Sequence, residues 1–364
     1  MAITRSQLLK ELEPGLNALF GMEYDRYDNE HSEVFETETS DRAFEEEVML
    51  AGFGQAPVKG EGAAVTYDTA NEAFTARYTH ETIALAFAIT EEAVEDNLYD
   101  RLSSRYTRAL ARSMANTKQV KAAAILNNAF NSSYAIGDGK ELCATDHPTV
   151  GGGDFANELS TSADLNETSL EQSLIDIAAF IDERGLKIAL QGRKLVIPPA
   201  LQFVAERLMA SNLRPGTADN DINASRNMGM LPDGYAVNHF LTDTDAFFIK
   251  TDAPNGFKHF VRSSIKTSME GDFETGNVRY KARERYSFGV SDPRCVFGGF
   301  NDISVASGTG AVTTNSSFSN NTSIGGTLSV TGAISGTSTI TARRSVNTDF
   351  NAAGAKTETL TAAQ

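Results

Sequence analysis

The sequence predicts an α+β protein, and three patterns support this fold class. Residues 278–290 alternate between apolar and mostly basic side chains, which is the period of a β-strand with one buried face. Residues 94–114 repeat apolar side chains every four positions, as a long amphipathic helix does. Beyond residue 167, amphipathic helices and short apolar strands occur in one unit. This mixture of helix and strand patterns is typical of an α+β fold.

Composition excludes several functional classes. The chain has 364 residues, of which 32 are basic and 48 acidic, so its net charge is -16. Proteins that coat nucleic acids neutralise phosphates with Lys and Arg, and this composition argues against such binding. Two cysteines and five scattered histidines indicate neither a disulfide scaffold nor a metal site. The longest apolar run, Ile83 to Ile89, is far shorter than the roughly 20 residues that cross a bilayer. We expect no cofactor, no membrane association and synthesis in the cytosol.

The first 90 residues divide into an acidic arm and a strand region. Residues 11–47 hold about 13 acidic side chains and two arginines. They have too little apolar surface to fold alone, so they are either mobile or ordered against a neighbour. The alternation at 65–67 and 74–78 predicts a hairpin with its turn at 69–72. Residues 83–89 alternate bulky side chains with alanine, which predicts a strand covered on both faces.

A long helix is expected next. Thr90 followed by Glu91 and Glu92 is a helix start, because carboxylates are favoured in the first turn. A four-residue stripe drifts about 40° per step around a helix with 3.6 residues per turn, so neighbouring elements should cross this helix obliquely. Acidic residues come early and basic residues late. The arginines in particular form a stripe at helical spacing: Arg101, Arg105, Arg108 and Arg112.

A glycine-rich loop, residues 131–157, precedes the second unit. There the patterns predict helices at 170–181 and 201–209, with a buried strand at 195–197 between them. Further strands are expected at 235–240, 246–250 and 258–265, and the strand at 278–290 follows.

The strand at 278–290 carries a basic ladder on one side: Arg279, Lys281, Arg283 and Arg285. Glu284 is the one charge on its apolar side. Adjacent like charges repel, so the ladder either faces water or meets a carboxylate-bearing partner. The sequence leaves these two interpretations open.

After residue 302 the composition changes to Ser, Thr, Gly, Ala and Asn. A flexible tail fits this composition. The regular spacing of Ile324, Leu328, Val330 and Ile334 instead favours short β segments that bury one aliphatic row by associating with copies of themselves.

No catalytic motif emerges from the sequence. Residues 137–140 lack the spacing and the hydroxyl residue of a phosphate-binding loop. Cys143 and His147 could pair as nucleophile and base, but no third group that would orient them is identifiable. We expect no enzymatic activity.

The order of these elements, and several short motifs, resemble the HK97-fold major capsid proteins of tailed bacteriophages, of the type found in Mu-like phages. The resemblance covers about residues 1–303 and rests on FEEE at 44–47 with GFG at 52–54, EG at 61–62, FAITEE at 87–92, DHP at 146–148, KLVIPP at 194–199 and YKARERYSFGV at 280–290.

The resemblance implies a domain organisation. Residues 1–55 would form an N-terminal arm and 56–90 an extended hairpin loop that lies over a neighbouring subunit. The implied remainder is a peripheral domain at 91–167 with a spine helix at 91–130, an axial domain at 168–265, a return to the peripheral domain at 266–303, and a Gly/Ser/Thr-rich, β-prone C-terminal extension at 304–364. Some members of the family cross-link a loop lysine to a neighbour, and Lys59 is the nearest candidate, but no partner motif identifies that activity here.

The resemblance also implies the function. The chain would assemble as hexamers and pentamers into an icosahedral head that encloses double-stranded DNA without sequence-specific binding. Scaffold, portal and decoration proteins are possible partners, and the protein would lie in the virion capsid after assembly in the host cytoplasm. We expect the acidic arm to contact basic surfaces of an adjoining subunit, through Glu33, Glu36, Glu38, Asp41 and Glu45 on one side and Arg101, Arg105, Arg108, Arg112, Arg279, Lys281, Arg283 and Arg285 on the other.

Two other functions remain open from the sequence. The Gly/Ser/Thr-rich end suggests a trimeric fibre or adhesin subunit, although this explains the tail alone. An encapsulin-like compartment shell would share the fold and store enzymes instead of a genome.

Overall fold

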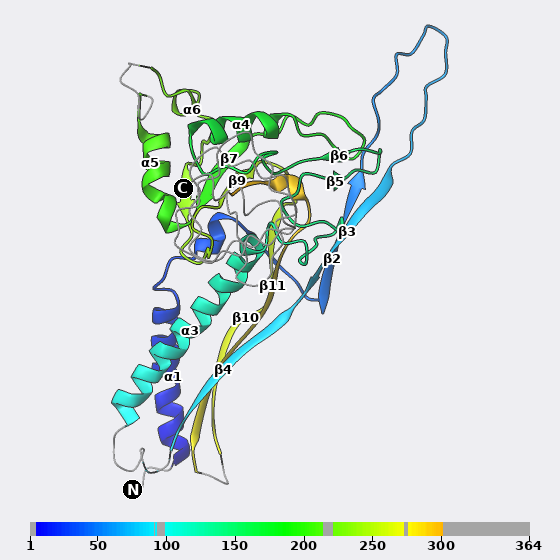
Figure 1. The fold of residues 1–364 in the computed structure, drawn as a ribbon. Coiled ribbons are helices and arrows are strands. Elements are labelled where there is room, and N and C mark those ends of the chain that lie inside the picture. The colour runs from blue at the N-terminus through cyan, green and yellow to red at the C-terminus, as the bar shows by residue number, and fades with distance from the viewer. Residues whose placement is uncertain (1–4, 91, 93–98, 214–220, 273–275, 301–364) are drawn as a thin grey trace, which may run out of the picture. The chain divides into compact units, whose positions relative to one another are not determined.

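The computed structural model describes residues 5–90, 92, 99–213, 221–272 and 276–300, all within the unit formed by residues 1–303. Two four-stranded sheets and several helices make up this part of the chain (Figure 1). The aliphatic row of the tail lies outside the described residues, as do Glu91 and residues 93–98, over which the expected helix would begin.

The first sheet has the strand order β1-β10-β11-β4. Its strands are β1 (Glu36–Thr39), β10 (Phe257–Gly271), β11 (Val278–Val290) and β4 (Glu81–Ile89). Helices α1 (Arg5–Tyr24) and α3 (Tyr99–Asn127) pack together against this sheet (Figure 1). Between them lies an apolar cluster that includes Leu16, Phe20, Met114 and Tyr280. The strand expected at 278–290 is confirmed, with its apolar row buried beneath the helices.

Helix α3 confirms the long helix expected from the four-residue stripe. Leu110 and Met114 are buried, whereas Tyr106 is 48% exposed. The stripe therefore leaves the core toward its N-terminal end, as expected where a four-residue repeat drifts around a helix.

The hairpin lies at a different place from the one expected. β2 (Phe44–Ala51) pairs antiparallel with β3 (Asn71–Thr79), and residues 52–70 connect them. β4 then leaves the hairpin and pairs with β11. The predicted strand at 65–67 and turn at 69–72 are wrong, since Val65 and Tyr67 are exposed and pair with no strand in the described part of the chain. The acidic run 45–47 conceals the true partner strand, because three consecutive glutamates give no apolar alternation even though β2 alternates exposed and half-buried residues.

The second sheet has the order β12-β9-β7-β8. Its strands are β12 (Val296–Gly299), β9 (Phe247–Thr251), β7 (Gly192–Ile197) and β8 (Tyr235–Val237). Helices α4 (Glu167–Ala178) and α5 (Gln202–Ala210) contribute to its apolar cluster. These elements confirm the helices and strands expected after residue 167, except that the strand at 235–240 is shorter than expected. The smaller elements are η1 (Glu30–Glu33), β5 (His147–Pro148), β6 (Asp154–Phe155), η2 (Pro199–Leu201), α6 (Ala224–Asn227) and η3 (Pro293–Cys295).

Strand pairing shows where the chain passes between the two sheets. β10 begins at Phe257 and pairs along its length with β11, so it belongs to the first sheet. β12 pairs with β9 and returns the chain to the second sheet. A core cluster shared by both sheets contains Phe248, Phe257, Val290 and Val296. The sheets are joined at this cluster because β9 leads into the start of β10, and the end of β11 leads through η3 into β12.

Candidate subunit interfaces

The outer face of the first sheet is basic and uncovered in the described structure. Arg279, Lys281 and Arg283 are exposed, whereas the alternate residues of β11 face α1 and α3. In register beside these three lie Ala88, Ala86 and Ala84 of β4, all exposed. Arg279 forms an ion pair with Asp272, and Arg285 is half-buried with its Nε lacking a partner among the described residues. The expectation that both faces of residues 83–89 are covered is therefore wrong within one chain, because helices pack on a single face of the sheet.

The arginine stripe lies on the solvent side of α3. Arg105, Arg108 and Arg112 are exposed, and Arg101 belongs to the first turns of the same helix. Arg112 approaches the nearly buried Glu23 of α1 at 3.8 Å. Helical spacing thus brings the stripe together, and its charges remain mostly open to water.

The acidic arm finds partners in its own chain. Val34 and Phe35 are buried in the cluster shared by both sheets, so this part of the arm is ordered against the body of the chain. Glu33 pairs with Lys194 at 2.5 Å. Glu38 and Glu47 both pair with Lys258, at 2.8 and 2.6 Å.

The other arm carboxylates are less constrained. Glu45 accepts a hydrogen bond from Ser40 at 2.6 Å, and Glu36 and Asp41 are exposed. Within one chain, the described partners of the five predicted arm carboxylates are therefore two lysines and a serine. Among the described residues, these five carboxylates make no ion pair with the arginines of α3 or β11, whereas Glu23, earlier in the arm, approaches Arg112 at 3.8 Å.

A buried ionic network lies under the first sheet. Glu284, 1% exposed, pairs with Lys118 of α3 at 2.7 Å. Lys118 also donates to the Tyr24 hydroxyl at 2.6 Å, and that hydroxyl donates to Glu284 at 3.1 Å. Burial, with the Glu284 charge, raises the pKa of Tyr24 above its ordinary value. The one charge on the apolar side of β11 thus has a dedicated cation, which no local sequence signal indicated.

Buried histidines fasten the arm to the sheet. The rings of His31 and His259 meet edge-on at 5.3 Å, and His259 stacks on Phe288 at 4.3 Å. Burial, together with the nearby His31 and Lys118, lowers the pKa of His259 to about 3. Burial also lowers the pKa of His31, so both imidazoles are neutral at pH 7.

His147 lies between Asp138 and Asn157. Its Nδ1 is 2.6 Å from the Asp138 carboxylate and its Nε2 is 3.0 Å from the Asn157 amide oxygen. The Asn157 amide nitrogen donates to the carbonyls of Leu142 and Pro293, which fixes this orientation of the amide. Both imidazole nitrogens are occupied, and burial raises the pKa of Cys143. The geometry therefore does not support Cys143 and His147 as a nucleophile and its base.

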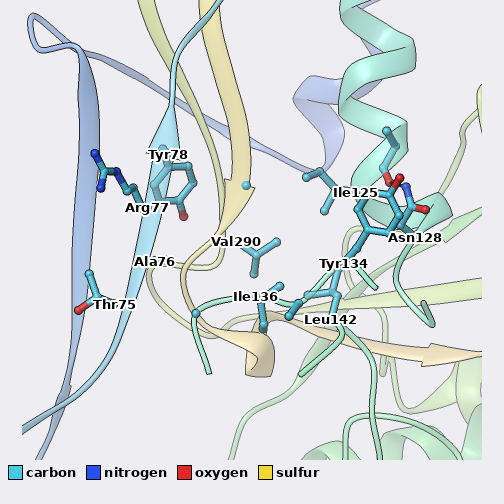
Figure 2. Close-up of a pocket in the computed structure, with 14 residues that line it drawn as sticks. Thr75, Ala76, Arg77, Tyr78, Ile125, Asn128, Tyr134, Ile136, Leu142 and Val290 are labelled. Carbon is cyan, nitrogen blue, oxygen red and sulfur yellow. Dashed lines mark hydrogen bonds between the residues drawn. The ribbon is translucent and has the colours of Figure 1, made fainter. Parts of the chain in front are cut away.

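A groove of about 500 Å³ opens beside this loop (Figure 2). Ile125, Ile136, Leu142 and Val290 line it, with Tyr134 at its rim. Among its described lining residues, Arg77 carries the one charge. The described lining is mixed, with the polar side chains of Thr75, Tyr78 and Asn128 beside the apolar ones, and it includes no His, Cys, Asp, Glu or Lys. Among the residues described, no cluster of three or more potential metal ligands occurs. In that same part of the chain, no helix combines the length and the apolar character that a membrane span requires.

Comparison with known proteins gives a consistent result. The profile of a family described as phage capsid protein matches residues 72–298. The capsid of an empty GTA particle is 12% identical, with 74% of this chain and 89% of that chain covered and a TM-score of 0.48. The capsid of Cyanophage P-SCSP1u is 13% identical, with coverage of 73% and 86% and a TM-score of 0.46. The capsid of Myoviridae phage XM1 is 11% identical, with coverage of 73% and 88% and a TM-score of 0.45. No curated protein sequence is significantly similar.

Proposed function

Because this chain belongs to the phage capsid protein family, we propose that it is the major head subunit of a tailed, Mu-like bacteriophage and encloses double-stranded DNA. The match over residues 72–298 carries this proposal. A shell subunit needs no active site. Its stability comes from many moderate interfaces repeated by symmetry, each burying on the order of 1,000 Å² or more. A net charge of -16 also suits a container whose wall should not bind its DNA tightly.

The proposed organisation follows the HK97 fold. Residues 1–55 serve as the arm, and the hairpin loop lies over a neighbouring subunit. α3 serves as the spine helix of the peripheral domain, and the second sheet forms the axial domain around five-fold and six-fold positions. The exposed apolar side chains of Val58, Val65 and Tyr67 in the connecting loop support the role given to the hairpin, since contact with a neighbour would remove them from water.

The basic surfaces are proposed contacts between subunits. Glu36 and Asp41 are the exposed arm carboxylates available to reach Lys281 or Arg283 of an adjoining copy. Reversing one charge, Lys281→Glu, should impair assembly, and adding Glu36→Lys should partly restore it. If Lys281→Glu assembles as well as the parent chain, the ladder only faces water.

Electron microscopy of the purified full chain tests the proposed function. We expect closed icosahedral shells. The fraction of the chain in shells is measured with and without a crowding polymer. Fibres would indicate an adhesin-like subunit, and small shells filled with enzyme would indicate a storage compartment. A chain that stays monomeric at high concentration would refute the proposal.

The C-terminal extension is proposed to lie on the outside of the head, where copies of it meet or bind a decoration protein. Removing residues 304–364 should then lower the thermal stability of the particles. Particles of normal yield and unchanged stability would remove any cementing role.

A further inference from the structure

The two edges of the first sheet differ in a way that points to an additional interface. β1, at one edge, has four residues, and two of them are the exposed acids Glu36 and Glu38. β4, at the other edge, has nine residues. From Thr82 to Ile89 it contains neither a charge nor a proline. In the described part of the chain, β11 is its one strand partner.

An open edge strand presents unpaired backbone groups and tends to pair with another chain. Proteins usually protect such edges with charges, proline, bulges or short length, and the β1 edge follows this rule. Apart from Glu81 at its first position, which pairs with Lys121, the β4 edge has none of these protections. Leu85 is 46% exposed, and Ala84, Ala86 and Ala88 are also exposed. A long, uncharged edge with exposed apolar side chains is expected to be covered in the working state of the protein.

We propose that β4 pairs antiparallel with β4 of a second copy, about a two-fold axis through Leu85. This inference rests on the proposed assembly into a shell, which brings many copies together. The strand is self-complementary about this axis. Leu85 meets its own mate, Ile83 meets Phe87, and Ala84 meets Ala86, so bulky residues pair on one face and small residues on the other. The register that overlaps all nine residues is the one centred on Leu85.

The charges of the sheet permit this pairing. The basic ladder of β11 lies one strand inside the edge, so the two ladders would be separated by three strand spacings, about 14 Å. That distance exceeds the Debye length of about 8 Å at physiological ionic strength, and repulsion between the ladders is screened. The alternative occupant of the β4 edge is an acidic strand of another protein, which the basic ladder would attract. The acidic row of such a strand would lie opposite Ala84, Ala86 and Ala88. Its other row would still have to be apolar to match Ile83, Leu85 and Phe87. The β4 strand of a second copy supplies that apolar row.

Cysteine cross-linking tests both the pairing and its register. In the full chain, Leu85→Cys should place two thiols opposite each other, at a Cβ separation of about 5 Å, and mild oxidation should convert most of the chain to covalent dimers. Thr82→Cys is the matched control. Its two copies would lie six residues apart along the strands, about 20 Å, and should stay at the background of the parent chain. The native Cys143 and Cys295 are buried, so that background should be low.

A charge placed at the edge provides a second test. Ala86→Lys would bring two lysines together near the two-fold axis and should reduce the yield of assembled protein at least tenfold. Ser264→Lys, exposed on β10 of the same sheet, should not. If particles form but Leu85→Cys remains uncross-linked, or if Thr82→Cys cross-links equally, the β4 pairing is wrong and the capsid function stands. If the parent chain never assembles while Leu85→Cys forms dimers, the pairing stands and the proposed function fails.

Discussion

Removing the cation of the buried network should unfold the protein more readily than removing an exposed lysine of the same helix. Lys118→Met leaves Glu284, 1% exposed, without its partner at 2.7 Å. Breaking a buried ion pair from one side costs about 3–5 kcal/mol, because an uncompensated charge remains in the interior. Lys121 also pairs with a carboxylate, Glu81, but these side chains are 37% and 60% exposed. Exposed pairs contribute about 0–1 kcal/mol, so Lys121→Met should be nearly neutral.

Urea unfolding of the unassembled full chain, followed by far-ultraviolet circular dichroism, measures both variants. The double variant Lys118→Met with Glu284→Met supplies the decisive comparison. Replacing a whole buried pair by apolar side chains of similar volume is often neutral or stabilising, so the double variant should recover most of the lost stability. If Lys118→Met loses no more than Lys121→Met, or if the double variant is as unstable as the single one, Glu284 does not depend on Lys118.

Three further predictions follow from buried groups. His259 has a pKa near 6.5 in the unfolded chain and about 3 in the folded chain, so the unfolded chain binds the proton first as the pH decreases. The free energy of unfolding should therefore fall as the pH decreases from 6.5 to 3. His259→Phe should flatten this pH dependence in denaturation experiments. Gly256→Ala should destabilise the chain by about 1–3 kcal/mol, because the new Cβ would overlap Cys295. Gly15→Ala, in α1 with open space around it, should instead stabilise the chain by about 0.5–1 kcal/mol. Thermal melting distinguishes the two variants, and equal melting temperatures would contradict this packing. Asn157→Leu should cost about 3 kcal/mol or more, because the two carbonyls and the backbone amide that it bonds lose their partner, and a loss under about 1 kcal/mol in the same assay would contradict this role.

Local patterns predicted individual elements well. The alternation at 278–290 corresponds to β11, and the helices expected after residue 167 correspond to α4 and α5. These predictions succeed because the period of apolar residues depends on the geometry of a single element and on which side of it is buried. The motifs that carry the family resemblance are likewise short and local.

Pairing between elements was harder to predict. The sequence pattern predicts a strand partner for β3 at 65–67, whereas the partner in the structure lies at 44–51, in a run rich in glutamate. The partners of Glu284 and Glu38 are Lys118 and Lys258, each more than 160 residues away. A local pattern holds no information about which distant residue neutralises a buried charge or completes a sheet.

The amino-acid sequence by itself therefore determined the fold class, the positions of most helices and strands, the basic ladder and the absence of recognisable catalytic motifs. The tertiary structure alone decided that the acidic arm is held by lysines of its own chain, that His147 is fully engaged by Asp138 and Asn157, and that β4 lies at an open edge. The reason is physical. Periodicity and composition belong to neighbours along the chain, whereas burial, ion pairing and strand order are settled by contacts between residues that folding brings together.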